Sequence, residues 1–318
     1  MYPTFYDLFL DLFGVSVPAF KYMQSYGMMV GIGFIIGSIL LTLELKRKEN
    51  ICQILPTKKD KKDIKGDAGD GLVHPHEHVG NIAIIVGIGA IVGGKLFHNL
   101  ENWDEVVSDP VGALTRMSGL SFYGGMILSM VMFIWYAKKH KVSILHFFDA
   151  SMPALAIGYG FGRLGCHISG DGDWGIPNDN PMPEWISFLP DWMWAYNYPN
   201  NVLGVDMIQF YAEKGYTSLT GFAYPTPIYE IFMSIMIFGV LWAMRKRWKV
   251  PGLMISGYFI LGGIERLLIE QIRINNEYDI LGGITQAEII STSMIVLGTL
   301  GFYYLPKGAG ARWAKFGT

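Results

Sequence analysis

Seven long apolar segments divide this chain of 318 residues, and no other feature constrains its fold as strongly. A helix needs about 20 mostly apolar residues to cross a bilayer. The hydrophobic share of 51% and the charged share of 16% are also typical of a membrane protein rather than a soluble one. We therefore predict an all-α, polytopic membrane protein with about seven transmembrane helices. They are expected at residues 26–45, 79–98, 120–137, 144–164, 225–244, 252–272 and 285–305.

The basic residues between these segments predict the direction in which the chain crosses the membrane. Lysines and arginines concentrate at 46–65, 138–141, 245–249 and in the C-terminal tail, whereas the alternate loops are acidic or neutral. Because basic loops stay in the cytoplasm, we expect the N-terminus outside and the C-terminus inside. The expected organisation is an interfacial N-terminal segment (1–25), transmembrane helices 1–4 (26–165) with a basic cytoplasmic loop (46–78), a periplasmic head or cap (166–224), transmembrane helices 5–7 (225–305) and a cytoplasmic tail (306–318).

The segment 166–224 is too long for a plain loop and is rich in Trp, Pro, Asn and Asp. We interpret it as an outward-facing cap over the membrane entrance, with a purely structural elaboration as the alternative. Indole rings prefer the membrane–water interface. The tryptophans expected there are Trp174, Trp185, Trp192 and Trp194.

An arginine, Arg163, lies near the end of the fourth apolar segment. Gly158, Gly160 and Gly162 precede it and Gly165 follows it. A charged side chain costs at least ~2.5–3.5 kcal/mol near the bilayer centre and less near the interface. Glycines let another backbone or a lipid headgroup come close. These residues favour the hypothesis that Arg163 binds an anionic headgroup.

A second group of charges lies in the sixth apolar segment, at Glu265, Arg266, Glu270 and Arg273. Arg266 is four residues from Glu270 and seven from Arg273, so the three share one face of a helix. Exposure of a charged stripe to lipid has a high free-energy cost. We therefore expect the stripe to face the bundle interior, toward Arg163. Either these charges form a salt-bridge lattice, or the acids hold two arginines available for an anion.

Three further features carry weaker signals. The step SFYGGM (121–126) begins the third segment, where backbone N–H groups at a helix start favour anions, although glycine pairs also serve helix packing. Tyr26 begins the first segment and is typical of an interfacial anchor. His74, His76 and His78 are metal-ligand types, but they fall on the predicted cytoplasmic side and chelate zinc only from an extended loop.

Composition and missing motifs exclude several classes of function. The net charge of −2 gives no indication of a nucleic-acid partner. The two cysteines, Cys52 and Cys166, lie far apart and do not make a disulfide scaffold. The GYGFG run follows no expected strand and is no nucleotide-binding fingerprint. We expect no cofactor and no metal.

Taken together, the motifs resemble those of the prolipoprotein diacylglyceryl transferase family, in the same order and over most of the chain. They are the Tyr26-Gly27 step, SFYGG (121–125), GRLGCHISGDGDWG (162–175), YPTPIYE (224–230), the stripe of Arg266, Glu270 and Arg273, and GGITQAEIIS (282–291).

This resemblance implies a fold, a reaction and a location. The fold is seven spans with an outward head, in the inner (cytoplasmic) membrane of a bacterium. The reaction moves a diacylglyceryl group from phosphatidylglycerol to the lipobox cysteine thiol of a preprolipoprotein, and glycerol phosphate leaves. The partners are therefore phosphatidylglycerol, preprolipoprotein signal peptides and membrane lipids.

The resemblance also implies roles for individual residues. The catalytic set is Arg163, Arg266, Tyr26, Tyr123 and Glu270. The substrate-binding set is Arg163, Arg266, Gly124, Gly125, Asp171, Gly175 and Arg273. Arg163 and Arg266 would stabilise the leaving phosphodiester, with Glu270 and Asp171 orienting them.

The chain departs from the family pattern at several positions. These departures leave the identity of the general base, which accepts the proton of the thiol, undetermined. Tyr123 replaces a family histidine, Cys166 replaces an asparagine, and either Asp171 or Asp173 matches a family glutamate. Tyr123 would then hydrogen-bond the phosphate, and His167 is an alternative base. The rival function is a non-catalytic protein that binds or transports an anionic lipid on the same scaffold.

Overall fold

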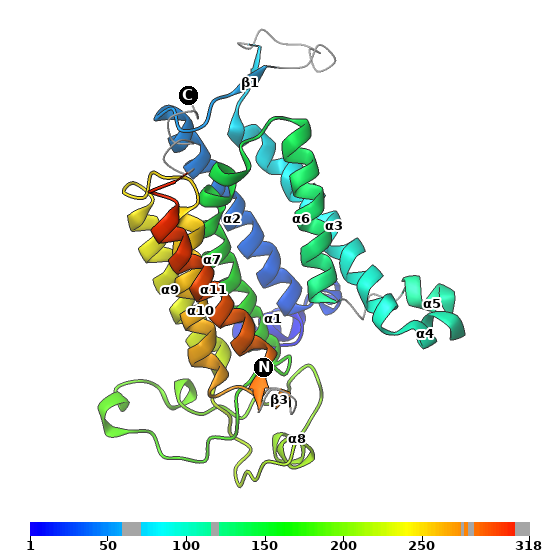
Figure 1. Ribbon diagram of the computed structural model, residues 1–318. Helices are drawn as coiled ribbons and strands as arrows, with labels where there is room; N and C mark the ends of the chain where they lie inside the picture. Colours follow the sequence, from blue (N-terminus) through cyan, green and yellow to red (C-terminus); the bar gives the residue numbers. More distant parts are fainter. Residues whose placement is uncertain (59–70, 116–120, 275–276, 279–282, 309–318) are drawn as a thin grey trace. The chain divides into compact units, whose positions relative to one another are not determined.

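The computed structural model describes residues 1–58, 71–115, 121–274, 277–278 and 283–308. Within these ranges the fold is almost entirely helical (Figure 1). The long helices are α2 (Ser25–Asn50), α3 (His78–Glu101), α6 (Phe122–Lys139), α7 (Ile144–Ser169), α9 (Thr226–Met244), α10 (Leu253–Glu270) and α11 (Gln286–Tyr304). The short helices are α1 (Phe5–Phe13), η1 (Pro18–Tyr22), η2 (Pro75–Glu77), α4 (Trp103–Ser108), α5 (Pro110–Thr115), η3 (Glu184–Ile186), η4 (Asp191–Met193) and α8 (Met207–Glu213). The strands form two short antiparallel pairs, β1 (Thr57–Lys58) with β2 (Leu72–Val73) and β3 (Glu277–Tyr278) with β4 (Ile284–Thr285).

Each of the seven apolar segments coincides with one of the long helices, which confirms the all-α, polytopic prediction. Among the described residues, four stretches are long and apolar enough to cross a membrane: Ser25–Asn50, Pro75–Glu101, Thr226–Met244 and Gln286–Tyr304. Of the other three long helices, α7 is interrupted by charges such as Arg163 and α10 by charges such as Glu265, whereas α6 ends in two lysines, Lys138 and Lys139. Seven crossings and the N-out, C-in orientation stay predictions.

The expected interfacial segment contains a short amphipathic helix, α1. Thr4 and Asp7 form a capping box at its start, which satisfies the free N–H groups of the first turn. Gly14 ends the helix in the left-handed conformation, with φ of 65°. The rings of Phe5 and Phe9 pack against Phe20 of η1 at 6.5 and 5.1 Å between centroids. The segment is therefore a helical hairpin held together by apolar side chains. Its place on a membrane surface stays a prediction.

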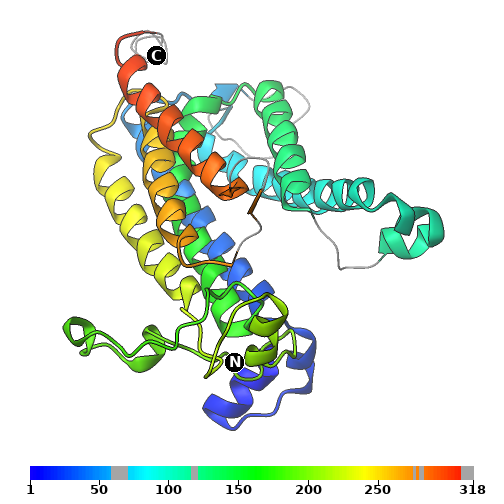
Figure 2. The ribbon, with the colours of Figure 1, turned by 60° about the horizontal axis from the view of Figure 1, so that its bottom comes forward.

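The chain forms two compact units, and α2 and α7 each contribute to both. The first unit is Met1–Gly37 with Ser151–Arg312, and the second is built on Ser38–Ala150. In the first unit, α9, α10 and α11 run as neighbours beside the second half of α7 (Figure 2). Glycines allow this closeness, because a Cβ on Gly263 would lie 2.8 Å from the carbonyl oxygen of Ser291.

The segment between α7 and α9 folds as a small head at one end of the first unit (Figures 1 and 2). Its core is a cluster of buried side chains from loops and α8: Trp174, Tyr198, Met207, Tyr211 and Ala223. The four tryptophans of this segment are not equivalent. Trp174 is 1% exposed and belongs to this core, so its predicted place at the membrane interface is wrong, whereas Trp185 is 79% exposed.

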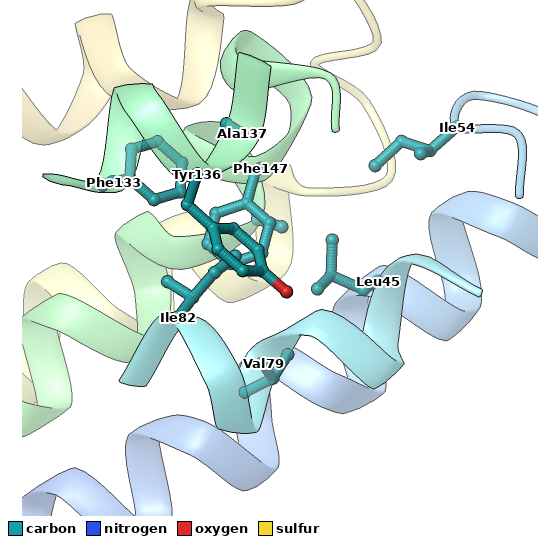
Figure 3. Close-up of a cluster of buried hydrophobic side chains, with 9 residues drawn as sticks. Leu45, Ile54, Val79, Ile82, Phe133, Tyr136, Ala137 and Phe147 are labelled. Carbon is teal, nitrogen blue, oxygen red and sulfur yellow. The ribbon is translucent and has the colours of Figure 1, made fainter. Parts of the chain in front are cut away.

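In the second unit, α3 packs closely against α6. Gly93 of α3 faces Gly124 of α6, where a Cβ on either residue would lie within 2.4 Å of the other's carbonyl oxygen. The apolar core of this unit combines both helices with the second half of α2 and the first turns of α7, through buried residues such as Leu45, Phe133 and Phe147 (Figure 3). Transfer of one such side chain from water to a buried position contributes roughly 1.5–3 kcal/mol to the free energy of folding.

Candidate functional site

The centre of the first unit's charged site is a carboxylate shared by two arginines. Asp173 accepts a hydrogen bond from Arg163 on one oxygen and from Arg273 on the other. The three side chains are partly exposed, at 17%, 16% and 30% for Arg163, Arg273 and Asp173. The chain therefore holds two guanidinium groups about one anion.

A second carboxylate, Glu230 of α9, lies behind this bridge and is fully buried. Its Oε1 atom is 3.4 Å from Nε of Arg163 and 3.7 Å from an Nη atom of Arg273. Tyr159 of α7 donates a hydrogen bond to the same oxygen at 2.7 Å, and its ring lies 5.0 Å beneath the guanidinium of Arg163. Two guanidiniums thus face two carboxylates, and Arg163 is fixed on three sides.

The backbone around Asp173 explains how residues 100 apart along the chain meet. Gly170 and Gly172 adopt positive φ angles of 65° and 99°, which turn the chain back after α7. The hydroxyl of Thr226 donates to the carbonyl of Asp173 at 2.7 Å. Gly175 then forms a β-bridge with Arg273. Gly175 therefore positions the ion pair, and the substrate contact that the resemblance implies for it stays a prediction.

Substitution of Gly175 by alanine should separate this bridge. The added Cβ would lie 2.4 Å from the carbonyl oxygen of Ile272 and 2.9 Å from a methyl carbon of Thr226. The segment that contains Gly175 must therefore move away from these two residues. A displacement of about 1 Å in a catalytic group lowers rates about 10²-fold, and we expect a loss of this size in turnover with the helical content unchanged. Gly239→Ala is the matched control, because a Cβ there meets nothing within 4 Å. Equal turnover in both variants would contradict the positioning role.

Arg266 and Glu270 form a separate ion pair within α10. Their charged groups lie 2.6 Å apart, and Thr285 donates to the other oxygen of Glu270 at 2.5 Å. The Nη1 group of Arg266 is buried and has no hydrogen-bond partner among the described residues. An unsatisfied buried donor of this kind is suited to an anionic ligand.

The members of the predicted charged stripe have different partners in the structure. The helix α10 ends at Glu270, and Arg273 lies beyond it on a turn. Arg273, and not Arg266, shares Asp173 and Glu230 with Arg163. The prediction that Arg266 and Arg273 share one helical face is wrong, because the seven-residue spacing applies only while the helix continues.

Asp173, rather than Asp171, carries these ion pairs, which corrects the expected orienting role of Asp171. Asp171 instead accepts a hydrogen bond from the backbone N–H of Asp173 at 3.4 Å. Burial raises the pKa of Asp171 above its ordinary value. Burial would also raise the pKa of Asp173, but Arg273 and Arg163 outweigh it and hold that pKa below its ordinary value. Asp173 is therefore the stable anion of the pair.

Tyr26 and Cys166 border the same cluster. A Cβ on Gly165 of α7 would lie 3.1 Å from Cα of Tyr26, so this glycine lets α2 approach α7 closely. A ring carbon of Tyr26 would lie 3.2 Å from the same Cβ. The thiol of Cys166 donates to Asp173 at 3.5 Å. Both residues therefore lie beside the arginine cluster, and the catalytic role of Tyr26 stays a prediction.

Tyr123, Gly124 and Gly125 belong to the second unit. Both glycines are buried against α3, and a Cβ on Gly125 would lie 2.8 Å from the carbonyl oxygen of Ala90. The contacts described for these glycines are therefore packing contacts, which was the alternative given to the SFYGGM step. Tyr123 is 39% exposed at the start of α6. Substrate contact by these three residues stays a prediction.

The histidines considered from the sequence have other partners. His167 lies among aromatic rings of the head, 5.6 Å from the ring centroids of Tyr196 and Tyr198. In the second unit, the imidazole of His74 faces Glu49 at 2.5 Å, whereas that of His78 pairs with Tyr136 at 2.9 Å.

The metal-binding capacity of the site is limited by its arginines. Cys166, Asp171 and Asp173 place one sulfur and two carboxylate oxygens within 4.8 Å of one another. Both oxygens of Asp173, however, already accept from guanidinium groups. Positive charge at this distance disfavours a cation. The arrangement is suited to an anion, with Arg163 and Arg273 as its two cations.

Sequence reasoning missed two members of the cluster. Glu230 was quoted within the YPTPIYE motif but was given no role, although a single acid within a mostly apolar span was a signal of the same kind as Arg163. Tyr159 gave no signal, since tyrosine is common in membrane helices. Its function as a hydrogen-bond donor to Glu230 depends on the packing of α7 against α9.

Comparison with known proteins matches residues 15–304 to the family described as prolipoprotein diacylglyceryl transferase. Similar curated proteins carry the name phosphatidylglycerol--prolipoprotein diacylglyceryl transferase. That of Leptospira interrogans is 27% identical over 292 residues, covering 81% of this chain and 76% of the relative. That of Clostridium tetani is 26% identical over 293 residues, covering 92% and 94%. That of Psychrobacter arcticus is 28% identical over 245 residues, covering 74% and 81%. The family match extends from the apolar N-terminal hairpin to the end of α11 and includes every residue of the arginine cluster, so the chain belongs to the prolipoprotein diacylglyceryl transferase family.

Proposed function

We propose that this chain transfers the diacylglyceryl group of phosphatidylglycerol to the cysteine thiol of a prolipoprotein. The names of its relatives state this reaction. The observation that carries the proposal is the pair formed by Arg163 and Arg273, which hold one carboxylate between them near the end of the long helix α7. A phosphodiester has the charge and the two free oxygens to take the place of that carboxylate.

The reaction is an alkyl transfer at the glycerol carbon that bears the phosphate. The thiol sulfur forms a bond to this carbon, and the carbon–oxygen bond to the phosphate breaks. Negative charge grows on the leaving oxygen, and preorganised cations in a site of low dielectric stabilise it well. Arg163 and Arg273 bind the phosphate bidentately, and Arg266, held by Glu270, supplies a third guanidinium through its unsatisfied Nη1 group.

The proposed setting is the inner membrane of a bacterium, with the N-terminus outside and the C-terminus inside. The basic stretch 46–65 and the links at 138–141 and 245–249 support this direction. In this orientation the head, residues 166–224, is a periplasmic cap above the arginine cluster. The substrates would be phosphatidylglycerol from the bilayer and a signal peptide that presents its lipobox cysteine to the same side.

Rescue of a bacterium depleted of its own transferase tests this function in the cell. We expect this chain to restore growth and the lipidated form of a reporter prolipoprotein. The rival function, lipid binding or transport without catalysis, predicts no rescue although the protein reaches the membrane. A catalytically dead relative expressed at the same level is the control for indirect effects.

A further inference from the structure

The carboxylate of Asp173 occupies the position that a substrate phosphate needs. It offers one oxygen to Arg163 and the other to Arg273, which is the pattern in which two guanidiniums bind the two non-bridging oxygens of a phosphodiester. Glu230 supports both arginines from the buried side. Phosphate binding therefore requires one of the two carboxylates to leave, because two cations do not hold three anions in a site of low dielectric.

Exposure and backbone geometry decide which carboxylate leaves. Glu230 is 0% exposed on α9 and accepts a hydrogen bond from Tyr159, whereas Asp173 is 30% exposed and lies in the loop after α7. Gly172, just before Asp173, has a φ of 99°, and the backbone of Asp173 is held by Thr226. The side chain of Asp173 can therefore rotate away from the arginines while its backbone stays in place.

We propose that Asp173 is a catalytic residue, displaced from the arginines by the lipid phosphate and then the acceptor of the proton of the attacking thiol. This inference rests on the proposed transferase function and identifies the base that the replacement of the family histidine by Tyr123 leaves open.

A thiol already contacts this carboxylate within the protein. The Sγ atom of Cys166, which is 6% exposed, donates to Asp173 at 3.5 Å and lies 4.0 Å from the guanidinium of Arg163. A carboxylate that can accept a proton and a guanidinium group therefore both border this sulfur. The site thus accommodates sulfur at hydrogen-bond distance from Asp173.

Displacement from the arginines changes the affinity of Asp173 for a proton. While Arg273 and Arg163 face Asp173, they hold its pKa below the ordinary value against the effect of burial. Once a phosphate neutralises them, burial remains and raises the affinity of Asp173 for a proton. The titratable groups that face Asp173 or interact with it electrostatically are Arg163 and Cys166 from α7, Arg273 after α10, Glu230 from α9, Tyr26 from α2 and Asp171 from the same turn.

The step is balanced without an added reactant. The thiol S–H bond breaks and its proton moves to the carboxylate of Asp173. The sulfur electron pair forms the new bond to the glycerol carbon, and the pair of the carbon–oxygen bond leaves with glycerol phosphate. Departure of glycerol phosphate frees the arginines, and Asp173 returns to them as it loses its proton to the leaving phosphate or to water.

Asp173→Asn tests the proposal, because the amide keeps the size of the side chain but cannot accept a proton. In proteoliposomes containing phosphatidylglycerol, we expect kcat to fall about 10²-fold or more at pH 7, the range for loss of a general base. The KM for phosphatidylglycerol should stay the same or decrease, since no carboxylate then competes for the arginines. A structural role of Asp173 predicts the opposite, a raised KM from misplaced arginines.

The pH profile supplies a readout that a structural role would not change. The wild-type kcat/KM, which reports the free enzyme, should be nearly flat from pH 6 to 8, because Arg273 and Arg163 hold the pKa of Asp173 below its ordinary value of about 3.9 before the phosphate binds. The variant must rely on spontaneous ionisation of the substrate thiol, with a pKa of about 8.5, so its rate should rise about tenfold per pH unit over the same range. A flat profile in Asp173→Asn would overturn the proposal.

Two further variants keep the result interpretable. Asp173→Glu retains a base and should keep the flat profile even if its rate is lower, and a tenfold rise per pH unit in this variant would also overturn the proposal. Asp206→Asn is the matched control in the head, because Asp206 caps α8 and asparagine caps helices equally well; it should match the wild type. Absence of transfer by the wild type itself would instead contradict the proposed function.

Discussion

Replacement of Arg163 by alanine should abolish transfer while the protein stays folded in the membrane. Arg163 is the residue in contact with Asp173, Glu230 and the ring of Tyr159 at once, so it is the central cation of the phosphate site. Loss of one preorganised donor to a developing oxyanion costs about 10²–10³ in rate. Loss of a full guanidinium should cost at least as much, measured as lipidated peptide formed per minute.

Two companion variants distinguish charge from geometry. Arg163→Lys keeps the positive charge but cannot form two parallel hydrogen bonds to a phosphate, so its activity should lie between wild type and alanine. Arg247→Ala is the matched control, since Arg247 is exposed in the basic link after α9. Normal transfer by Arg163→Ala would contradict the proposed phosphate site.

Glu230→Gln should have the largest effect on stability. Glu230 is fully buried, and its carboxylate lies within 3.7 Å of two guanidiniums. Removal of one partner from a buried ion pair costs about 3–5 kcal/mol, because the remaining charges are left uncompensated. We expect a clear fall in the midpoint of thermal unfolding in detergent micelles, together with a loss of transfer.

The exposed residue Glu184 of the head provides the comparison for this variant. Glu184→Gln should change stability by no more than about 0.5 kcal/mol, as is usual for a surface substitution. If Glu230→Gln unfolds at the same temperature as Glu184→Gln, the buried carboxylate does not stabilise the arginine pair and the described charge balance is wrong.

The helices were predictable because the bilayer sets their length and composition. Each of the long helices, from α2 to α11, coincides with an apolar segment of about 20 residues, and the charges that interrupt these segments identified Arg163 and Arg266. In such segments an ionisable residue is costly, so its presence already indicates a partner or a function. This physical argument needs no knowledge of how the helices pack.

The pairing of the charges was less predictable, because it depends on where helices end. Arg273 appeared to continue the face of Arg266, but α10 ends at Glu270 and Arg273 instead pairs with Gly175 across a β-bridge. The repeat Gly-Asp-Gly-Asp likewise could not show which aspartate faces the arginines. The positive φ of Gly172 turns the chain between the two, and Asp173 is the one that contacts them.

The most direct test of the transferase function is a reconstituted reaction with defined components. The purified protein would be placed in vesicles containing phosphatidylglycerol, with a lipobox peptide that carries its cysteine, and the products would be measured by mass spectrometry. We predict a peptide whose mass increases by one diacylglyceryl group, equimolar release of glycerol phosphate, and no product when serine replaces the cysteine or when phosphatidylglycerol is omitted. Binding of phosphatidylglycerol without any change in the peptide would contradict the transferase function and support the lipid-binding alternative.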